Sequence, residues 1–230
     1  MAAVAAALSC ANWQFGRAAE KRELIASFDR GLATNSDLGS GTVDALPRYQ
    51  HVTARGHYDP SRQVLLDNMP SSDGYAGYRV LTPFVRPGSA KLLLVDRGWV
   101  PLGLSRERLP LVGVADGMRE VAGRLDQLPV PGIRVGTAGT PGDTRWPRVL
   151  MFPTALDLEQ VFGAPVESRI VLLDADQPDG YQRVWRPALE FPPERHLGYA
   201  VQWIALAIVA IVIFIALSLQ PALDPESTRS

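Results

Sequence analysis

Residues 197–219 constrain this chain most, because they read LGYAVQWIALAIVAIVIFIALSL and carry no formal charge. As a helix this stretch would be about 35 Å long at ~1.5 Å per residue, enough to cross a hydrocarbon core of ~30 Å. Its Leu, Ile, Val and Phe side chains favour insertion into a bilayer. Core helices of soluble proteins seldom carry so long an apolar run. The sequence therefore predicts a transmembrane helix over residues 197–219.

The N-terminal residues 1–11 are also apolar, but they are too few to span a bilayer. They lack the basic segment that begins a secretory signal. We expect them to be the end of a partial first membrane helix, followed by Trp13 at the interface and by the cationic Arg17. A lipid-attached Cys10 is the alternative.

Between the two apolar segments, residues 12–196 are long enough to form one domain with its own core. The 19 prolines and 20 glycines favour a turn-rich domain over a helical bundle. The single cysteine, Cys10, excludes an internal disulfide and a cysteine-based metal cage. A net charge of −1 gives no indication of a nucleic-acid partner. Residues 220–230 would form a short tail on the other side of the membrane from the domain, which is the cytoplasmic side if the domain is exported.

The pattern in this domain predicts an α+β fold, a mostly antiparallel β domain with one or two packed helices, flanked by the membrane helices. One helix is expected over residues 12–32. A second is expected over 155–162, with Thr154 as its N-cap and Gly163 closing it. A loop rich in Gly and Pro covers residues 126–147. Apolar and alternating runs predict strands over 49–58, 64–67, 78–84, 92–96, 120–125, 150–152 and 170–174.

Three of the predicted apolar strands end in aspartate, at Asp67, Asp96 and Asp174. If the three carboxylates met, they could bind a divalent cation. In the alternative, each aspartate begins the turn after a buried strand and accepts nearby backbone N–H groups. Nothing in the sequence brings the three strand ends together, so we prefer the second interpretation.

Signals for catalysis are weak, because the chain contains no G-x-S-x-G, no H-E-x-x-H and no P-loop. On a strand, His51 and His57 would lie about 20 Å apart at ~3.3 Å per residue, too far to share a ligand. We therefore expect a protein that is not an enzyme.

His196 stands out because it directly precedes the predicted membrane span. On a helix, His196, Tyr199 and Trp203 would share one face. A neutral imidazole can ligate haem iron, and the two aromatic rings offer a flat apolar surface for a macrocycle. The alternative is an interfacial anchor, since His, Tyr and Trp are common at membrane edges.

Four segments along the chain form a recognisable series of motifs. They are Trp13-Gln14 followed by Arg17, Lys21 and Leu24-Ile25; GYRVLTPF at 77–84; LVDRGWVP at 94–101; and ERHLGYAVQW at 194–203.

In this order and spacing, the motifs resemble those of the surfeit locus protein 1 family of cytochrome oxidase assembly factors. The third motif is similar to that family's V-N-R-G-W-V-P signature, with Asp96 in place of the usual Asn. The fourth is similar to its N-E-H-x-x-Y-x-x-x-W junction.

The resemblance implies a protein integral to the cell inner membrane, with two membrane helices flanking one periplasmic domain. It implies a non-enzymatic role in placing haem a into the catalytic subunit of an aa3-type cytochrome c oxidase. The expected partners are that subunit, the enzyme that makes haem a, and membrane lipid, with no nucleic acid. A scaffold that binds the oxidase but not haem is one alternative, and a membrane-anchored enzyme of unknown reaction is another.

The resemblance also implies that His196 is the ligand of the haem iron, beside Tyr199 and Trp203. Arg97 would then bind haem propionates or dock an oxidase subunit, together with Trp99. In the alternative, Gly98 permits a tight bend and Trp99 fills the core.

Overall fold

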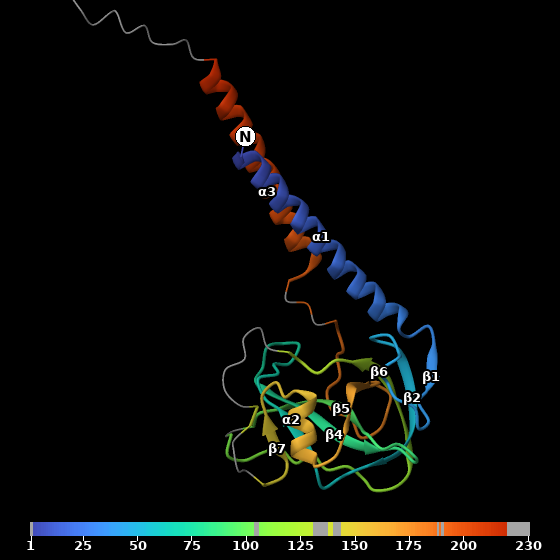
Figure 1. Cartoon of the computed structure of the whole chain (residues 1–230). Helices are drawn as coiled ribbons and strands as arrows, with labels where there is room; N and C mark the ends of the chain where they lie inside the picture. The colour runs from blue at the N-terminus through green and yellow to red at the C-terminus, as the bar shows by residue number, and fades with distance from the viewer. Residues whose placement is uncertain are drawn as a thin grey trace, which may run out of the picture. The chain divides into compact units, whose positions relative to one another are not determined.

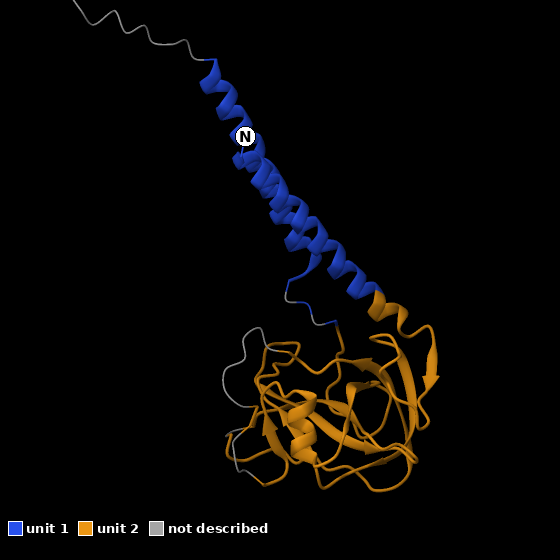
Figure 2. Ribbon diagram, viewed as in Figure 1, with its two compact units in different colours: residues 1–26, 187–230 blue, residues 27–186 orange. Residues whose placement is uncertain are grey.

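The computed structural model describes residues 2–103, 106–130, 138–139, 144–187, 189 and 191–219. The predicted tail at 220–230 and part of the predicted loop at 126–147 lie outside these residues. The chain divides into two compact units, shown in Figure 2. Unit 1 comprises Met1–Ala26 with Pro187–Ser230, and unit 2 comprises Ser27–Arg186.

Unit 1 contains two helices, α1 (Ala2–Arg30) and α3 (Pro193–Ser218), which lie side by side (Figure 1). α1 is continuous, so it joins the apolar residues 1–11 to the helix predicted over 12–32. Val4 and Ala7 of α1 form an apolar cluster with Ala207 of α3. Small side chains at such positions allow the backbones of two helices to approach closely.

α3 begins at Pro193, four residues before the predicted span. Proline suits the first turn of a helix, because it lacks the backbone N–H that would have no helical partner there. Its mean hydropathy is 2.8 over the most apolar window. Among the helices in the described residues, only α3 is long and apolar enough to cross a membrane. α1 contains the partial span expected over residues 1–11, but does not meet that criterion.

Five strands of unit 2 close into a barrel, which is more specific than the predicted antiparallel sheet. β2 (His51–Tyr58) and β4 (Gly77–Val85) complete the ring through a short pairing of Tyr58 with Phe84. Of the neighbouring pairs in the ring, β5 and β8 are parallel and the others are antiparallel. This is the strand order of the OB-fold, a five-stranded Greek-key barrel. The order around the ring is β2, β6 (Arg119–Asp126), β8 (Val166–Leu173), β5 (Leu92–Pro101) and β4.

The other elements extend or cover this barrel. β1 (Asn35–Asp37) adds a parallel edge to β2, and was not predicted. β3 (Val64–Leu66) pairs with β4, and β7 (Arg148–Leu150) pairs in parallel with β3. Helix α2 (Ala155–Phe162) has the predicted bounds.

Strands β5 and β8 are buried on both faces, which explains their nearly continuous apolar sequences. Leu93 and Val95 of β5 belong to a cluster with Phe84 and other residues of the barrel interior. Leu92 and Leu94 belong to a second cluster on the other face of the strand, which includes residues of α2. β5 continues to Pro101, because Trp99, Val100 and Pro101 also pair with β4. The prediction that this strand ends at Asp96 was wrong.

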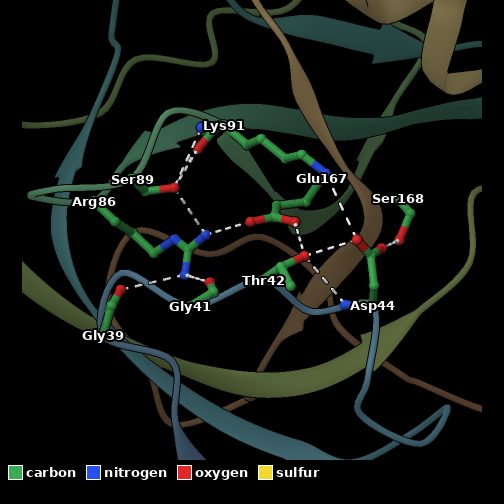
Figure 3. Close-up of polar contacts among 9 residues, drawn as sticks. All are labelled: Gly39, Gly41, Thr42, Asp44, Arg86, Ser89, Lys91, Glu167 and Ser168. Carbon is green, nitrogen blue, oxygen red and sulfur yellow. Dashed lines mark hydrogen bonds and ion pairs between the residues drawn. The ribbon is translucent and has the colours of Figure 1, made fainter.

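A buried ion pair between Arg86 and Glu167 connects the end of β4 to the start of β8, and both side chains also contact the loop at residues 39–44 (Figure 3). Both side chains are almost fully buried. Arg86 also donates to the carbonyl oxygen of Gly41 at 2.7 Å, and Thr42 donates to Glu167 at 3.1 Å. Because both charges are removed from water, the folded state is stable only if each charge keeps its partners.

We expect Arg86→Met to lower the free energy of unfolding by about 3–5 kcal/mol, because it leaves the carboxylate of Glu167 buried without a cation. Urea unfolding of the detergent-solubilised protein, followed by tryptophan fluorescence, measures this loss. Arg55→Met, on an exposed position of β2, is the matched control. The double variant Arg86→Met/Glu167→Met should recover most of the loss. Equal stability of Arg86→Met and the control would contradict the prediction.

Candidate functional site

The candidate site lies on the first turns of α3, around His196. This side chain is only 8% exposed. Ala200 and Ala207 follow it on the same face of the helix and are also buried. The sequence places an imidazole here in a row of otherwise small residues, so the ring lies in the packed face of unit 1.

The two ring nitrogens of His196 have different surroundings. Nδ1 lies 2.7 Å from Oε1 of Gln14 on α1. An amide oxygen only accepts hydrogen bonds, so in this geometry Nδ1 carries the proton and donates. Nε2 then bears a lone pair. Nε2 is buried and has no hydrogen-bond partner within the described part of the chain.

One aromatic side chain contacts the imidazole, and two others lie further along the same helix. Phe191, just before α3, packs edge-to-face on it with ring centroids 6.3 Å apart. The guanidinium of Arg195 lies 4.7 Å from the centroid of the Phe191 ring. Tyr199 is 45% exposed and Trp203 is 36% exposed. α3 thus brings together three of the residues predicted for the site, one of them buried and the other two open to their surroundings.

Among these residues, His196 is the one that could bind the iron of a haem group, through its Nε2. Histidine ligands of metals typically donate their second ring N–H to an oxygen acceptor, which orients the ring and raises the basicity of the ligating nitrogen. The contact of His196 with Gln14 has this geometry. Leaving a buried polar atom without a partner costs about 1–3 kcal/mol, so the unpaired Nε2 is a feature that needs a reason.

Arg97, which was predicted to contact propionates, lies in unit 2 and is almost fully buried. Burial lowers the pKa of its guanidinium. The N–H donors of Arg97 contact acceptors inside unit 2. Its contact with haem stays a prediction. It stacks over the rings of Tyr58 and Tyr181, at 5.7 and 5.0 Å from their centroids. It donates to carbonyl oxygens of Asp179 (2.7 Å), Val112 (3.0 Å) and Gly113 (2.9 Å) and to Oε1 of Gln63 (2.9 Å).

Trp99 also lies in unit 2, where its indole N–H donates to the carbonyl oxygen of Met69 at 2.9 Å. Between it and Arg97, Gly98 has φ +107°, and a Cβ there would meet the carbonyl oxygen of Gln182 at 2.7 Å. Only glycine fits this position without strain. A role of Trp99 in haem binding stays a prediction.

The three aspartates that end the apolar runs each contact a different basic side chain. Asp67 pairs with Arg106, and its carboxylate also accepts the N–H of Asn68 at 2.7 Å. Asp174 pairs with His51 at 2.6 Å. Within the described ranges, no group of three or more His, Cys, Asp or Glu side chains is arranged to hold a metal ion.

Asp96, the third of these aspartates, is fully buried and pairs with Arg79. It also accepts the backbone N–H of Gly98 at 3.0 Å. Burial raises the pKa of the Asp96 carboxyl, an effect that the positive charge of Arg79 opposes. Asp96 therefore stabilises the bend at Gly98 through a hydrogen bond to its backbone N–H.

Gln14 is the residue that the sequence reasoning missed as part of the site, although it belongs to the first motif. A signal for it exists in α1. Buried Val4, Ala7, Ala11 and Ala18 recur at alternating steps of three and four residues, and Gln14 takes the one remaining place in this series. A single polar residue in such a stripe indicates a specific partner on the facing helix.

Comparison with known proteins adds the family. The model of the SURF1 family matches residues 1–208. The chain belongs to the SURF1 family. A SURF1-like protein of Rickettsia conorii is 24% identical over 212 residues, covering 90% of this chain and 85% of the relative. A SURF1-like protein of Rickettsia felis is 33% identical over 93 residues, 40% of either chain.

The family match confirms the resemblance found in the motifs. Proteins of the SURF1 family are known generally as oxidase assembly factors and not as enzymes, and they are associated with membranes. The apolar helix α3 suits such an association.

We expect the pH dependence of stability to change in Asp96→Asn. The pKa of Asp96 is raised in the folded state, so the folded protein holds this proton more tightly than the unfolded chain. Its contribution to stability is complete below the unfolded pKa and is lost as pH rises through the folded pKa. The stability of Asp96→Asn relative to wild type should therefore rise as the pH increases from about 4 through the folded pKa of Asp96. Urea unfolding across this range measures the difference, and parallel curves or the opposite slope would refute the expectation.

Proposed function

We propose that this protein is a membrane-anchored assembly factor for an aa3-type cytochrome c oxidase, and that it assists delivery or insertion of haem a into the catalytic subunit. The observation that carries the proposal is the buried, unpaired Nε2 of His196. Membership of the SURF1 family supports the oxidase as the assembly that it serves.

A bound haem would supply an iron atom with an axial position open to a neutral nitrogen ligand. Nε2 of His196 is the nitrogen available for it, and Gln14 keeps the ring in the matching orientation. The exposed rings of Tyr199 and Trp203 provide apolar surface beside the imidazole for the macrocycle. One protein ligand on a partly open helix face suits transient carriage, because release then requires a single coordination bond to break.

Loading requires Nε2 to be uncovered, since the atom is not accessible in the structure. Phe191 is the aromatic neighbour on the N-terminal side of His196, and its contact with the imidazole is edge-to-face. Displacement of this ring would uncover one side of the imidazole.

The proposed setting follows from the same elements. α3 crosses the cell inner membrane, unit 2 lies in the periplasm, and residues 220–230 lie in the cytoplasm. The partners are the catalytic subunit of the oxidase, the enzyme that makes haem a, and the surrounding lipid. The predicted contact of Arg97 and Trp99 with an oxidase subunit belongs to this proposal as a contact of unit 2 alone.

The direct test is the amount of haem bound by the full-length protein purified from cells that make haem a. We expect wild type to carry haem, and His196→Ala to lose more than the ~10–100-fold in affinity typical of losing an outer-shell partner. His57→Ala, on an exposed position of β2, is the control and should retain haem. The absorption spectrum measures bound haem. A colourless wild type, or haem unaffected by His196→Ala, would refute carriage by this residue.

The same variant distinguishes the carrier from a scaffold. If the protein only scaffolds the oxidase, His196→Ala should still co-purify with it and should restore haem a content in cells that lack the gene. If the protein delivers haem, the variant should leave the oxidase deficient in haem a.

A further inference from the structure

We infer that Gln14 is a positioning residue for this site: its side-chain carbonyl fixes the tautomer and direction of His196, so that α1 as well as α3 builds the haem ligand. This inference rests on the proposed function. Gln14 does not touch the ligand position itself, because its contact is with Nδ1 on the other side of the ring.

The burial pattern of α1 carries the first step. Val4, Ala7, Ala11 and Ala18 are between 1% and 9% exposed, and their spacing repeats at three and four residues. Gln14 lies between Ala11 and Ala18 in the same series and is half-buried. It is the polar member of a stripe that otherwise contains small apolar side chains.

The hydrogen bond carries the second step. At 2.7 Å, the contact of Oε1 with Nδ1 is within the normal range for an N–H donor and an oxygen acceptor. If α1 moved along α3 by one place in the stripe, Ala11 or Ala18 would replace Gln14 opposite the imidazole. Neither alanine side chain accepts a hydrogen bond, so Nδ1–H would be buried without a partner. The pair therefore selects one register of the two helices.

The tautomer carries the third step. Free imidazole exchanges its proton between the two nitrogens, and the partner of one nitrogen decides which of them is left as the ligand. With Gln14 accepting from Nδ1, the lone pair is held on Nε2. An amide acceptor raises the basicity of the ligand less than a carboxylate does, because it carries no charge. The choice of glutamine favours a ligand that binds the iron and also releases it.

The first experiment needs no haem. The chain has three histidines, so selective ¹⁵N labelling of the full-length protein in detergent micelles resolves each ring. We expect His196 in wild type to carry its proton on Nδ1. Gln14→Leu should abolish that preference, and Gln14→Glu should retain it. A proton on Nε2 in wild type, or an unchanged preference in Gln14→Leu, would overturn the inference.

The second experiment uses the haem-loaded protein. We expect Gln14→Leu to weaken haem binding by ~10–100-fold and to raise the reduction potential of the bound iron. Gln14→Glu should retain binding and lower the potential, because a carboxylate increases the basicity of the ligand. Gln202→Leu removes an exposed glutamine of α3 and should leave both quantities unchanged.

The two proposals fail in different ways. If wild type binds no haem, the proposed function is refuted, and the tautomer measurement alone decides whether Gln14 positions the ring. If wild type binds haem through His196 while Gln14→Leu matches Gln202→Leu in affinity and potential, the proposed function stands and the role of Gln14 is refuted.

Discussion

Burial of β5 and β8 on both faces is the constraint on which the fold of unit 2 depends. One face of each strand fills the barrel, and the other lies against the cluster that includes α2. A polar side chain in such a strand must find its partners inside the protein. Asp96 does so with Arg79 and Gly98, and Arg97 does so with acceptors from several segments. The motif LVDRGWVP at 94–101 therefore serves in large part to stabilise the barrel.

The same burial bears on where function can reside. Barrels with the OB strand order commonly bind ligands on the face of their second and third strands, which correspond to β4 and β5. In this protein, the outward side chains Leu81 and Leu94 of these strands are buried in a cluster with α2. The chain thus covers with its own elements a surface that other barrels use for ligands. The candidate site lies instead in the helical unit, consistent with the rule that function belongs to a site and not to a fold.

The sequence was most informative where the signal is local. α2 has its predicted bounds because Thr154 and Asp157 form a reciprocal capping box and Gly163 adopts φ +65°. α3 was recognised from length and apolarity alone. β1 was missed because Asn35–Asp37 is polar and is a strand only through its pairing with β2. Closure of the barrel depends equally on a distant pairing, that of Tyr58 with Phe84, which leaves no mark in either segment. His196 was found from its place beside the span, but its partner Gln14 lies 182 residues away.

The buried polar side chains of this protein differ in how many of their hydrogen-bonding atoms have a partner. This difference distinguishes side chains that stabilise the fold from one that could bind a ligand. Within the part of the chain that the structure describes, Nε of Arg86 has no partner, yet the other two nitrogens bind Glu167 and two carbonyl oxygens. The hydroxyl of Tyr58 has no partner among the same residues, but its ring lies beneath two guanidinium groups, which account for its position. In His196, Nδ1 is hydrogen-bonded to Gln14, while Nε2 has no partner among the described residues. An apolar side chain would pack this interface without that penalty. A ligand bound to Nε2 would supply the missing partner. For this reason the two helices, and not the barrel, are the better place to look for haem.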